Sequence, residues 1–368
     1  MTRLRGADAE TVRRALDADD PLAGTAGFAG FVSRGASHLA LDDFLVRDVL
    51  GRQPIFGTPD DWGFAPDGVA GDPTPVPAGH VREPDGTDRR VWSLPDPPAA
   101  SDDAAAVETV RHAVDDALAG LDGDGLAVAF SGGVDSALVA AGAPDAPCYV
   151  VGFPDAHDVR AARGAAAAMD RELRVVSLDH ADLERAVPEV VAATGRTNAM
   201  DVTIALPLYL VAERAAADGY DRLALGQGAD ELFGGYAKVV APADDDRVAA
   251  TTVRGATREV LGSLPDQLER DTLALRAAGV DPVVPLLTDG VVEAALPLPG
   301  HLLATADERK VALRRAAADR LPASVVDTDK KAVQYGSLVS RELDRLARQA
   351  GFKRRMDRHV DRYIESLV

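Results

Sequence analysis

L-A-V-A-F-S-G-G-V-D-S, residues 126–136, joins an apolar run to a turn rich in glycine and serine. A strand buried on both faces of a sheet is apolar almost without interruption, so residues 126–130 are predicted to form a strand of a parallel sheet. A helix is predicted to follow at residues 137–142. Glycines between a strand and a helix let the backbone approach an anion, and the amides and the helix N-terminus direct positive charge toward it. The segment therefore predicts a polyphosphate site.

The residues of this turn favour magnesium-ATP as the ligand. No lysine follows the glycines, which excludes the P-loop pattern. Asp135 would repel phosphate unless a divalent cation lay between them, and Mg²⁺ pairs one or two carboxylates with phosphate oxygens. Ser131 and Ser136 supply hydroxyl donors. The alternative is a plain glycine-rich turn between a strand and a helix.

Apolar runs alternate with helical stretches on both sides of this turn. The predicted strands are residues 126–130, 148–153, 174–178 and 222–226. The predicted helices are residues 101–121, 137–142, 158–170, 181–193 and 203–218. Parallel strands joined by right-handed helical crossovers predict an α/β fold with a doubly wound parallel sheet. After Tyr236 the chain is predicted to be wholly helical, with breaks at Pro265, Pro282, Pro285, Pro297, Pro299 and Pro322.

The first hundred residues differ from the rest of the chain in composition and in the length of their apolar runs. They contain many Gly and Pro residues and short apolar runs at residues 27–32 and 38–41, a pattern typical of β-rich structure. Residues 93–101 contain three prolines and are predicted to be a linker that ends at a helix N-cap. We therefore predict a small β-rich domain over residues 1–98 and an α/β domain over residues 99–368.

A second loop follows the strand predicted at residues 222–226. Residues 226–236 read G-Q-G-A-D-E-L-F-G-G-Y. Because the carboxyl ends of parallel strands meet at one edge of a sheet, Asp230 is predicted to face Asp135 across a bound metal-pyrophosphate. Two carboxylates buried together without a cation would be costly. In the alternative interpretation, Asp230 and Glu231 are the first-turn acids of a following helix.

These motifs carry a resemblance to known enzymes. S-G-G-V-D-S resembles the PP-loop of the ATP pyrophosphatases, and residues 226–236 closely resemble the G-E-G-A-D-E-L-F-G-G-Y signature of the asparagine synthetase family. Further similarity, including a K-x-x-L-R pattern that starts at Lys310, extends the resemblance over residues 126–337. It implies the ATP pyrophosphatase (adenine nucleotide α-hydrolase-like) fold. It also implies an AMP-forming carbon-nitrogen ligase that activates a carboxylate, aspartate in this family, as an acyl-adenylate and then lets ammonia displace AMP.

The resemblance also assigns site residues. It implies pyrophosphate and magnesium contacts from Ser131, Gly132, Gly133, Val134, Asp135 and Ser136. It implies adenosine contacts from Ala129, Val151, Leu225 and Gly226, positions that would be ordinary core in another fold. It implies substrate contacts from Gln227, Gly228 and Asp230, with Asp135 and Asp230 as the metal-associated acids.

Residues 329–337 resemble the lysine-bearing loop of the family. A departing pyrophosphate gains charge, and a lysine beside it stabilises the transition state more than the bound ATP. Only five lysines occur in the chain, so the adjacent pair Lys330 and Lys331 stands out. With Asp135 and Asp230 they form the predicted catalytic set, Lys330 being favoured by spacing. A solvated surface pair is the alternative.

The departures from the family pattern that bear most on function lie at Gln227 and in the first hundred residues. Gln227 stands where a glutamate is expected, and a neutral amide cannot pair with an ammonium group or act as a base, so the substrate or the handling of ammonia differs. The first hundred residues resemble only the closing strands of a glutaminase domain, and Met1-Thr2-Arg3 stands in place of the N-terminal cysteine. We predict a reduced, inactive glutaminase-like domain, with free ammonia or a separate glutaminase chain as the nitrogen source.

Composition limits the partners. The 368 residues carry 40 Lys and Arg against 59 Asp and Glu, a formal net charge of −19, and 45 of the acids are Asp. This excess repels nucleic acid and anionic membranes. Asp-rich, Lys-poor composition favours a halophilic protein, whose charge repulsion is screened by salt. Cys148 is the single cysteine, so no internal disulfide forms. With no signal peptide and no long apolar run, we expect a cytoplasmic protein that acts on small molecules.

Three functions remain open from the sequence. The leading hypothesis is an asparagine synthetase-type ligase without its own glutaminase activity. The second is an adenylating ligase of the same fold for another carboxylate and amine, including ring closure as in the β-lactam synthetases. The third is a non-catalytic ATP-binding regulator, against which the presence of Asp135, Asp230 and Lys330 argues.

Overall fold

The computed structural model describes residues 3–33, 43–327 and 333–368, which form two compact units. The first unit comprises Met1–Ala119, Gln227–Glu269 and Val284–Ala316; the second comprises Gly120–Gly226, Arg270–Val283 and Ala317–Val368. Within the described ranges, no helix combines the length and the apolar character that crossing a bilayer requires. The domain boundary near residue 98 remains a prediction.

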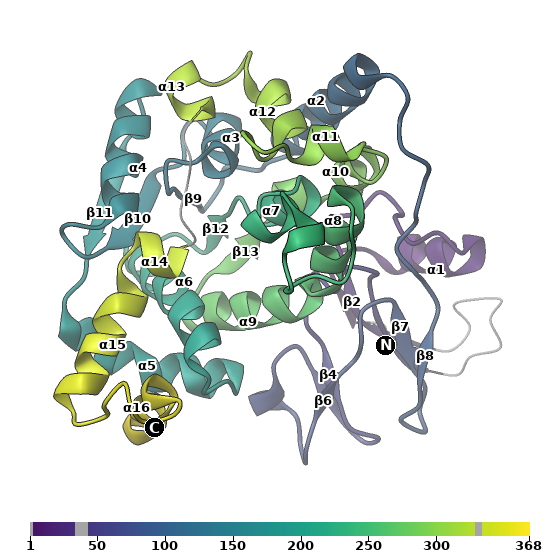
Figure 1. Ribbon diagram of the computed structural model, residues 1–368. Coiled ribbons are helices and arrows are strands. Elements are labelled where there is room, and N and C mark those ends of the chain that lie inside the picture. Colours follow the sequence, from purple (N-terminus) through teal and green to yellow (C-terminus); the bar gives the residue numbers. More distant parts are fainter. Residues whose placement is uncertain (1–2, 34–42, 328–332) are drawn as a thin grey trace. The chain divides into compact units, whose positions relative to one another are not determined.

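The second unit is built on a five-stranded sheet in the order β11-β10-β9-β12-β13. Every neighbouring pair is parallel, which confirms the predicted α/β class with a parallel sheet. In Figure 1 the strands run in this order from left to right. The chain moves outward from β9 on one side and then returns to add β12 on the other. Their bounds are β9 Leu126–Ala129, β10 Cys148–Gly152, β11 Leu173–Ser177, β12 Arg222–Ala224 and β13 Asp281–Val283.

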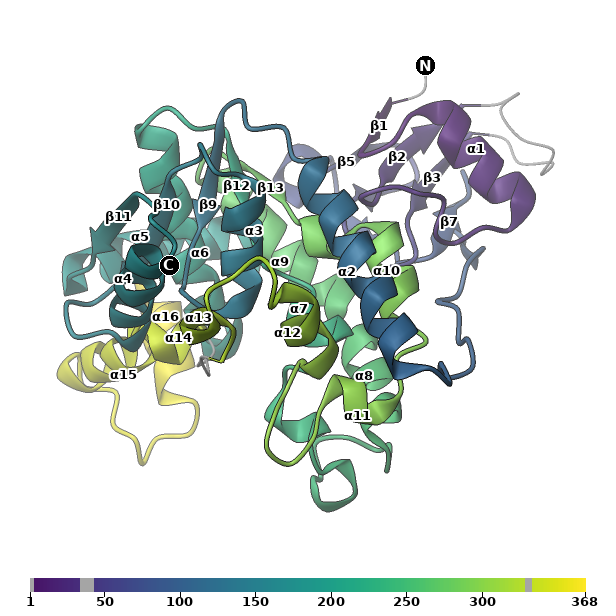
Figure 2. The ribbon, with the colours of Figure 1, turned by 90° about the horizontal axis from the view of Figure 1, so that it is seen from above.

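Helices connect and cover these strands (Figure 2). α4 and α6 both pack against β10, and α3 packs against β9. Their starts follow local capping: Asp179 and Asp182 form a capping box at α5, and Asn198 accepts the Asp201 amide at α6. The bounds are α3 Val134–Gly142, α4 His157–Ala168, α5 His180–Thr194, α6 Ala199–Ala217, α13 Ala323–Val326, α14 Val333–Gly336, α15 Val339–Gln349 and α16 His359–Leu367.

Two sequence predictions about this unit need correction. α3 begins at Val134 rather than at residue 137, so Asp135 and Ser136 lie in its first turn. The early start is hard to predict because the N-cap residue is Gly133, which has no polar group beyond its backbone to cap the helix. Residues after Tyr236 are not wholly helical, since β13 contains Pro282 and pairs with β12. The proline was interpreted as a helix break, but at the edge of a sheet a proline costs no ladder hydrogen bond on its open side.

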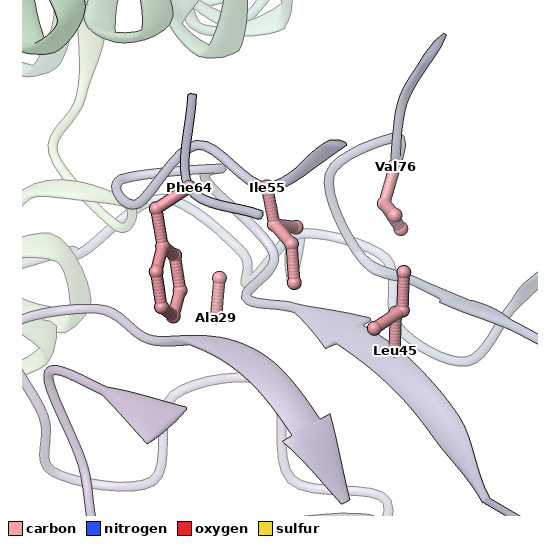
Figure 3. Packing of buried hydrophobic residues seen from close by; sticks show 5 residues of the cluster. All are labelled: Ala29, Leu45, Ile55, Phe64 and Val76. Carbon is pink, nitrogen blue, oxygen red and sulfur yellow. The ribbon is translucent and has the colours of Figure 1, made fainter. Parts of the chain in front are cut away.

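The first unit contains two small antiparallel sheets, ordered β1-β2-β3-β7-β8 and β5-β4-β6. Figure 3 shows Ala29 and Leu45 of the first sheet facing Ile55, Phe64 and Val76 next to the second, a buried cluster between the sheets. The β-rich prediction is confirmed here, and residues 38–41 lie outside the described ranges. The strands are β1 Arg3–Arg5, β2 Ala29–Val32, β3 Phe44–Arg47, β4 Phe56–Gly57, β5 Trp62–Gly63, β6 Thr74–Pro75, β7 His80–Arg82 and β8 Asp88–Arg90.

Helices complete the first unit. α2 packs against α10, and α7 packs against α8. The proline-rich residues 93–101 contain no helix or strand, and Arg258 donates from Nη1 to the Pro95 carbonyl at 2.8 Å. The helix bounds are α1 Ala9–Ala18, α2 Asp103–Ala119, α7 Ala229–Leu232, α8 Val253–Gly262, α10 Asp289–Ala295, α11 Gly300–Leu303 and α12 Val311–Ala317; α9, Leu264–Ala277, contributes to both units. Short 3₁₀ turns occur at Pro66–Gly68, Ala237–Val239, Pro242–Asp244 and Pro285–Leu287.

Candidate active site

The first glycine-rich loop lies at the carboxyl edge of the parallel sheet, between β9 and α3. Gly132 has a φ of +79°, which favours glycine strongly. A Cβ at this position would also lie 2.6 Å from both atoms of the Ala161 carbonyl group in α4. Both the backbone conformation and the close contact with α4 therefore require glycine at residue 132.

The two serines of the motif fix the shape of this loop. Ser136 Oγ accepts the Ser131 amide at 3.2 Å and donates to the Gly133 carbonyl at 3.1 Å. The two hydroxyl oxygens are 3.2 Å apart. The loop thus has internal hydrogen bonds of its own, and its glycine-rich backbone leads directly into the N-terminus of the nine-residue helix α3. A helix N-terminus favours negative charge, so the arrangement suits an anion.

Asp135 lies in the first turn of α3 and is only 4% exposed. It is held against the end of the neighbouring strand β12, because a Cβ on Gly226 would lie 2.7 Å from the Asp135 Cβ. The two strands pair in register, Ala224 opposite Val128. The structure therefore brings the first loop and the start of the second loop together at one edge of the sheet.

The positions assigned to adenosine lie at this same edge. Ala129 ends β9, Val151 is the penultimate residue of β10, and Leu225 and Gly226 follow β12. Val151 and Leu225 are buried, at 6% and 3% exposed, and Val134 is 4% exposed at the start of α3. Their contact with a nucleotide remains a prediction.

The rest of the second loop belongs to the first unit. Gly228 has a φ of +89°, and a Cβ added to it would overlap the side chain of Leu287. Glycine is therefore required at this position before α7. Gln227 and Asp230 are partly exposed. Asp230 Oδ1 lies 2.7 Å from Lys310 Nζ. Because Asp135 and Asp230 belong to different units, their joint metal site stays a prediction.

The alternative interpretation of Glu231 as a first-turn acid agrees with its position in the first turn of α7. Glu231 is also buried beside Asp230, at 6% exposed. Burial raises the pKa of Glu231 to about 7, and the charge of Asp230 acts in the same direction. Tyr236 Oη donates to Glu231 Oε1 at 2.6 Å. Sequence reasoning missed Glu231 and Lys310 as candidates, although both lie in motifs that carried the resemblance.

Lys330 and Lys331 lie outside the described residues. The described segments on either side adjoin the first loop's surroundings: α13 packs against α3 and α4, and the Ser337 carbonyl accepts the Phe153 amide at 3.2 Å. Gly336 is in contact with the buried Asp158 of α4, since a Cβ on Gly336 would overlap that carboxylate. Both flanks of the predicted lysine loop are thus anchored near the carboxyl edge of the sheet.

The residues of the first loop determine whether magnesium fits this site. Among residues 3–33, 43–327 and 333–368, no group of three or more His, Cys, Asp or Glu is placed to hold a metal ion. A Mg²⁺ bound to phosphates needs only one or two protein carboxylates. Asp135, the hydroxyls of Ser131 and Ser136 and the loop amides supply that donor set in one place, so the second unit's residues fit a metal-bound polyphosphate.

Comparison with known proteins gives two findings. A family model described as asparagine synthase matches residues 107–261 and 253–364. A protein of Methanocaldococcus jannaschii, which carries the name of a glutamine-hydrolyzing asparagine synthetase, is 28% identical over 281 residues. The match covers 67% of this chain and 52% of that protein, so the chain spans about half the length of the curated relative it matches.

Proposed function

Because the chain belongs to the asparagine synthase family, we propose that it is an ATP-dependent, AMP-forming carbon-nitrogen ligase. It activates a carboxylate, with aspartate as the first candidate, as an acyl-adenylate and releases pyrophosphate. Ammonia then displaces AMP and forms the amide.

One observation carries the proposal. The anion-accepting loop after β9 and the loop after β12 start side by side at the point where the strand order reverses. In open α/β sheets ligands bind outside the carboxyl ends of the strands at such a switch point. The loop's required glycine, its helix N-terminus and its buried acid together suit a metal-bound polyphosphate better than a simple connection does.

The protein's own residues would divide the work of adenylation. The amides of Gly132 and Gly133 and the N-terminus of α3 hold the pyrophosphate oxygens. Asp135, with Asp230 as the second acid, holds the magnesium-associated end of the phosphates, where Mg²⁺ would neutralise developing charge. Lys330, with Lys331 beside it, stabilises the departing pyrophosphate.

Gln227 leaves the acceptor as the open part of the family assignment. An amide at this position donates and accepts hydrogen bonds but carries no charge. A site with Gln227 therefore binds a cationic ammonium group less strongly than one with glutamate. This residue favours testing carboxylates other than aspartate as well, including substrates that close a ring on their own amine.

The experiment is ATP–pyrophosphate exchange with the full-length protein and a panel of amino acids. Exchange that depends on aspartate supports the synthetase, and exchange that depends on another acid assigns a different carboxylate. An adenylate-forming site must reverse its first step, so absence of exchange with every acid, in a protein that binds ATP, would refute the ligase and favour a regulator.

Asp135→Asn tests the assigned site. We expect exchange to be lost while the thermal unfolding transition is retained, because the substitution removes the charge and keeps the shape. Asp145→Asn, at an exposed residue of the same unit, is the matched control. Normal exchange by the Asp135 variant would contradict its role.

The nitrogen source and the solvent follow as separate proposals. We expect product from ammonium salts but not from glutamine, unless a separate glutaminase is added.

The net charge of −19 predicts loss of structure on dilution into low salt, because repulsion between carboxylates is then unscreened. Circular dichroism across a salt series tests this, and equal stability without salt would refute the halophilic assignment.

A further inference from the structure

Lys310 is the feature that the proposed function leaves unexplained. It is 7% exposed, and its Nζ lies 2.7 Å from Asp230 Oδ1. A lysine is almost never buried without a partner, because the ammonium group loses its hydration. The burial is unequal, since the lysine side chain is 8% exposed and the Asp230 side chain 43%. The buried charge thus supports an acid that remains accessible.

The backbone of Lys310 is unusual as well. Its φ is +58°, a left-handed conformation that costs free energy for any residue with a Cβ. Such a conformation persists only where the surroundings hold it. Arg309 donates from Nη1 to the Gly235 carbonyl at 2.9 Å, and Arg314 donates from Nε to the Arg309 carbonyl at 2.9 Å. These contacts fix the turn that carries Lys310 to the loop after α7.

Gly235 completes the arrangement. Its amide donates to the Asp230 carbonyl at 2.8 Å. A Cβ on Gly235 would overlap both Asp230 Oδ1 and Lys310 Cε, so the ion pair lies directly on the glycine backbone. The carboxylate of Asp230 is therefore confined on one side by Lys310 and on another by Gly235.

We propose that Lys310 is a positioning residue for Asp230. It fixes the carboxylate and offsets its negative charge, so that the loop can accept a metal-bound pyrophosphate in place of repelling it. The inference rests on the proposed function, in which Asp230 is the second acid of the pyrophosphate site. Lys310 acts through Asp230 and makes no contact with the substrate itself.

The test compares Lys310→Met, Asp230→Asn and the double variant in the full-length protein. Two quantities are measured: the affinity for magnesium pyrophosphate by calorimetry, and kcat and KM in pyrophosphate exchange with the activating amino acid. Partners that orient a ligating carboxylate typically contribute about 10–100-fold to affinity or activity, so Lys310→Met is expected to lose about that much of both. The KM for the amino acid should change little. Lys353→Met, at an exposed lysine, should match the original protein.

The double variant separates positioning from an independent effect. If Lys310 acts through Asp230, the double variant has the same pyrophosphate affinity and kcat as Asp230→Asn alone, because the effects of substituting two residues in direct contact are not additive. The proposal would be overturned if Lys310→Met lowered pyrophosphate affinity and kcat by the same factor in the original protein and in the Asp230→Asn variant. So would pyrophosphate affinity and kcat of Lys310→Met equal to those of Lys353→Met.

Should Lys310→Met fail to fold, Lys310→Gly removes the same ion pair while relaxing the positive φ, and the same losses are expected. Should the original protein show no exchange with any acid, the ligase proposal fails. The positioning proposal is then decided by pyrophosphate affinity alone, which requires no activation.

Discussion

A methyl group added to Gly226 should displace the first glycine-rich loop. The new Cβ would lie 2.7 Å from Asp135 Cβ, 2.8 Å from Asp135 C and 2.9 Å from Ser136 N. These atoms belong to the backbone and Cβ of α3, so none of them is the flexible end of a side chain that could turn aside. Moving from 2.7 Å to the 3.4 Å at which ordinary van der Waals contact begins requires a shift of about 0.7 Å.

The size of the effect follows from this shift. Overpacking a buried contact typically costs about 1–3 kcal/mol of stability. A misplacement of about 1 Å in a group that positions a substrate can cost about a hundredfold in rate, so a fall of roughly 10–100-fold is expected here. The loss of rate should exceed what the loss of stability explains, because the protein remains folded at assay temperature.

Gly226→Ala is assayed by urea unfolding and by pyrophosphate exchange. Gly164→Ala is the matched control: Gly164 lies on an exposed face of α4, and a Cβ there meets nothing within 4 Å. The control should gain about 0.5–1 kcal/mol, since glycine is unfavourable within a helix. If Gly226→Ala retained the original stability and exchange rate, the close packing of the β12 end against α3 would be refuted.

Three further predictions rest on other contacts. Gly336→Ala would place a Cβ on the buried Asp158 carboxylate, so about 1–3 kcal/mol of stability should be lost in urea, and an unchanged midpoint would contradict the packing. The Arg354 hydrogen bond holds the pKa of Asp344 well below its usual value of 3.8. Such a lowered pKa stabilises the fold above pH 3.8, and the stabilisation is lost progressively as pH falls further, so Asp344→Asn should cost about 1 kcal/mol at pH 7 and clearly less at about pH 2; equal losses at both would refute this. Burial raises the pKa of the Cys148 thiol to about 11, so it should react with Ellman's reagent at about pH 8 only on unfolding, and rapid labelling of the folded protein would be the contrary result.

Much of the parallel sheet could be predicted because its central strands β9 and β10 are largely buried and therefore almost continuously apolar. Each apolar run from residue 126 to residue 224 matches a strand to within two residues at either end. β13 could not be predicted in the same way, because its three residues include Pro282 and an exposed Asp281. Its strand conformation comes from pairing with β12, a tertiary interaction that no local pattern records.

The candidate site was only partly accessible to sequence reasoning. The loop after β9 was found because its glycines, serines and acid are contiguous. Lys310 was overlooked as a site residue, since composition alone treats all five lysines alike and the adjacent pair drew attention. What distinguishes Lys310 is burial, its positive φ and a partner 80 residues earlier in the sequence, Asp230. None of these properties is visible before the protein is folded.

The sequence posed an electrostatic difficulty: two acids in loops that should accept a polyanion, in a protein that is already strongly acidic. The sequence alone predicts magnesium as the mediator. The structure indicates that the negative charge of each acid is also offset by a positive group within its own unit. Asp135 lies in the first turn of α3, where the helix N-terminus favours negative charge, and Asp230 is paired with the ammonium group of Lys310. In the proposed site these charges are offset before any cation binds, so an incoming polyphosphate would be repelled less than the net charge suggests, and metal would be needed mainly where charge develops on the departing pyrophosphate.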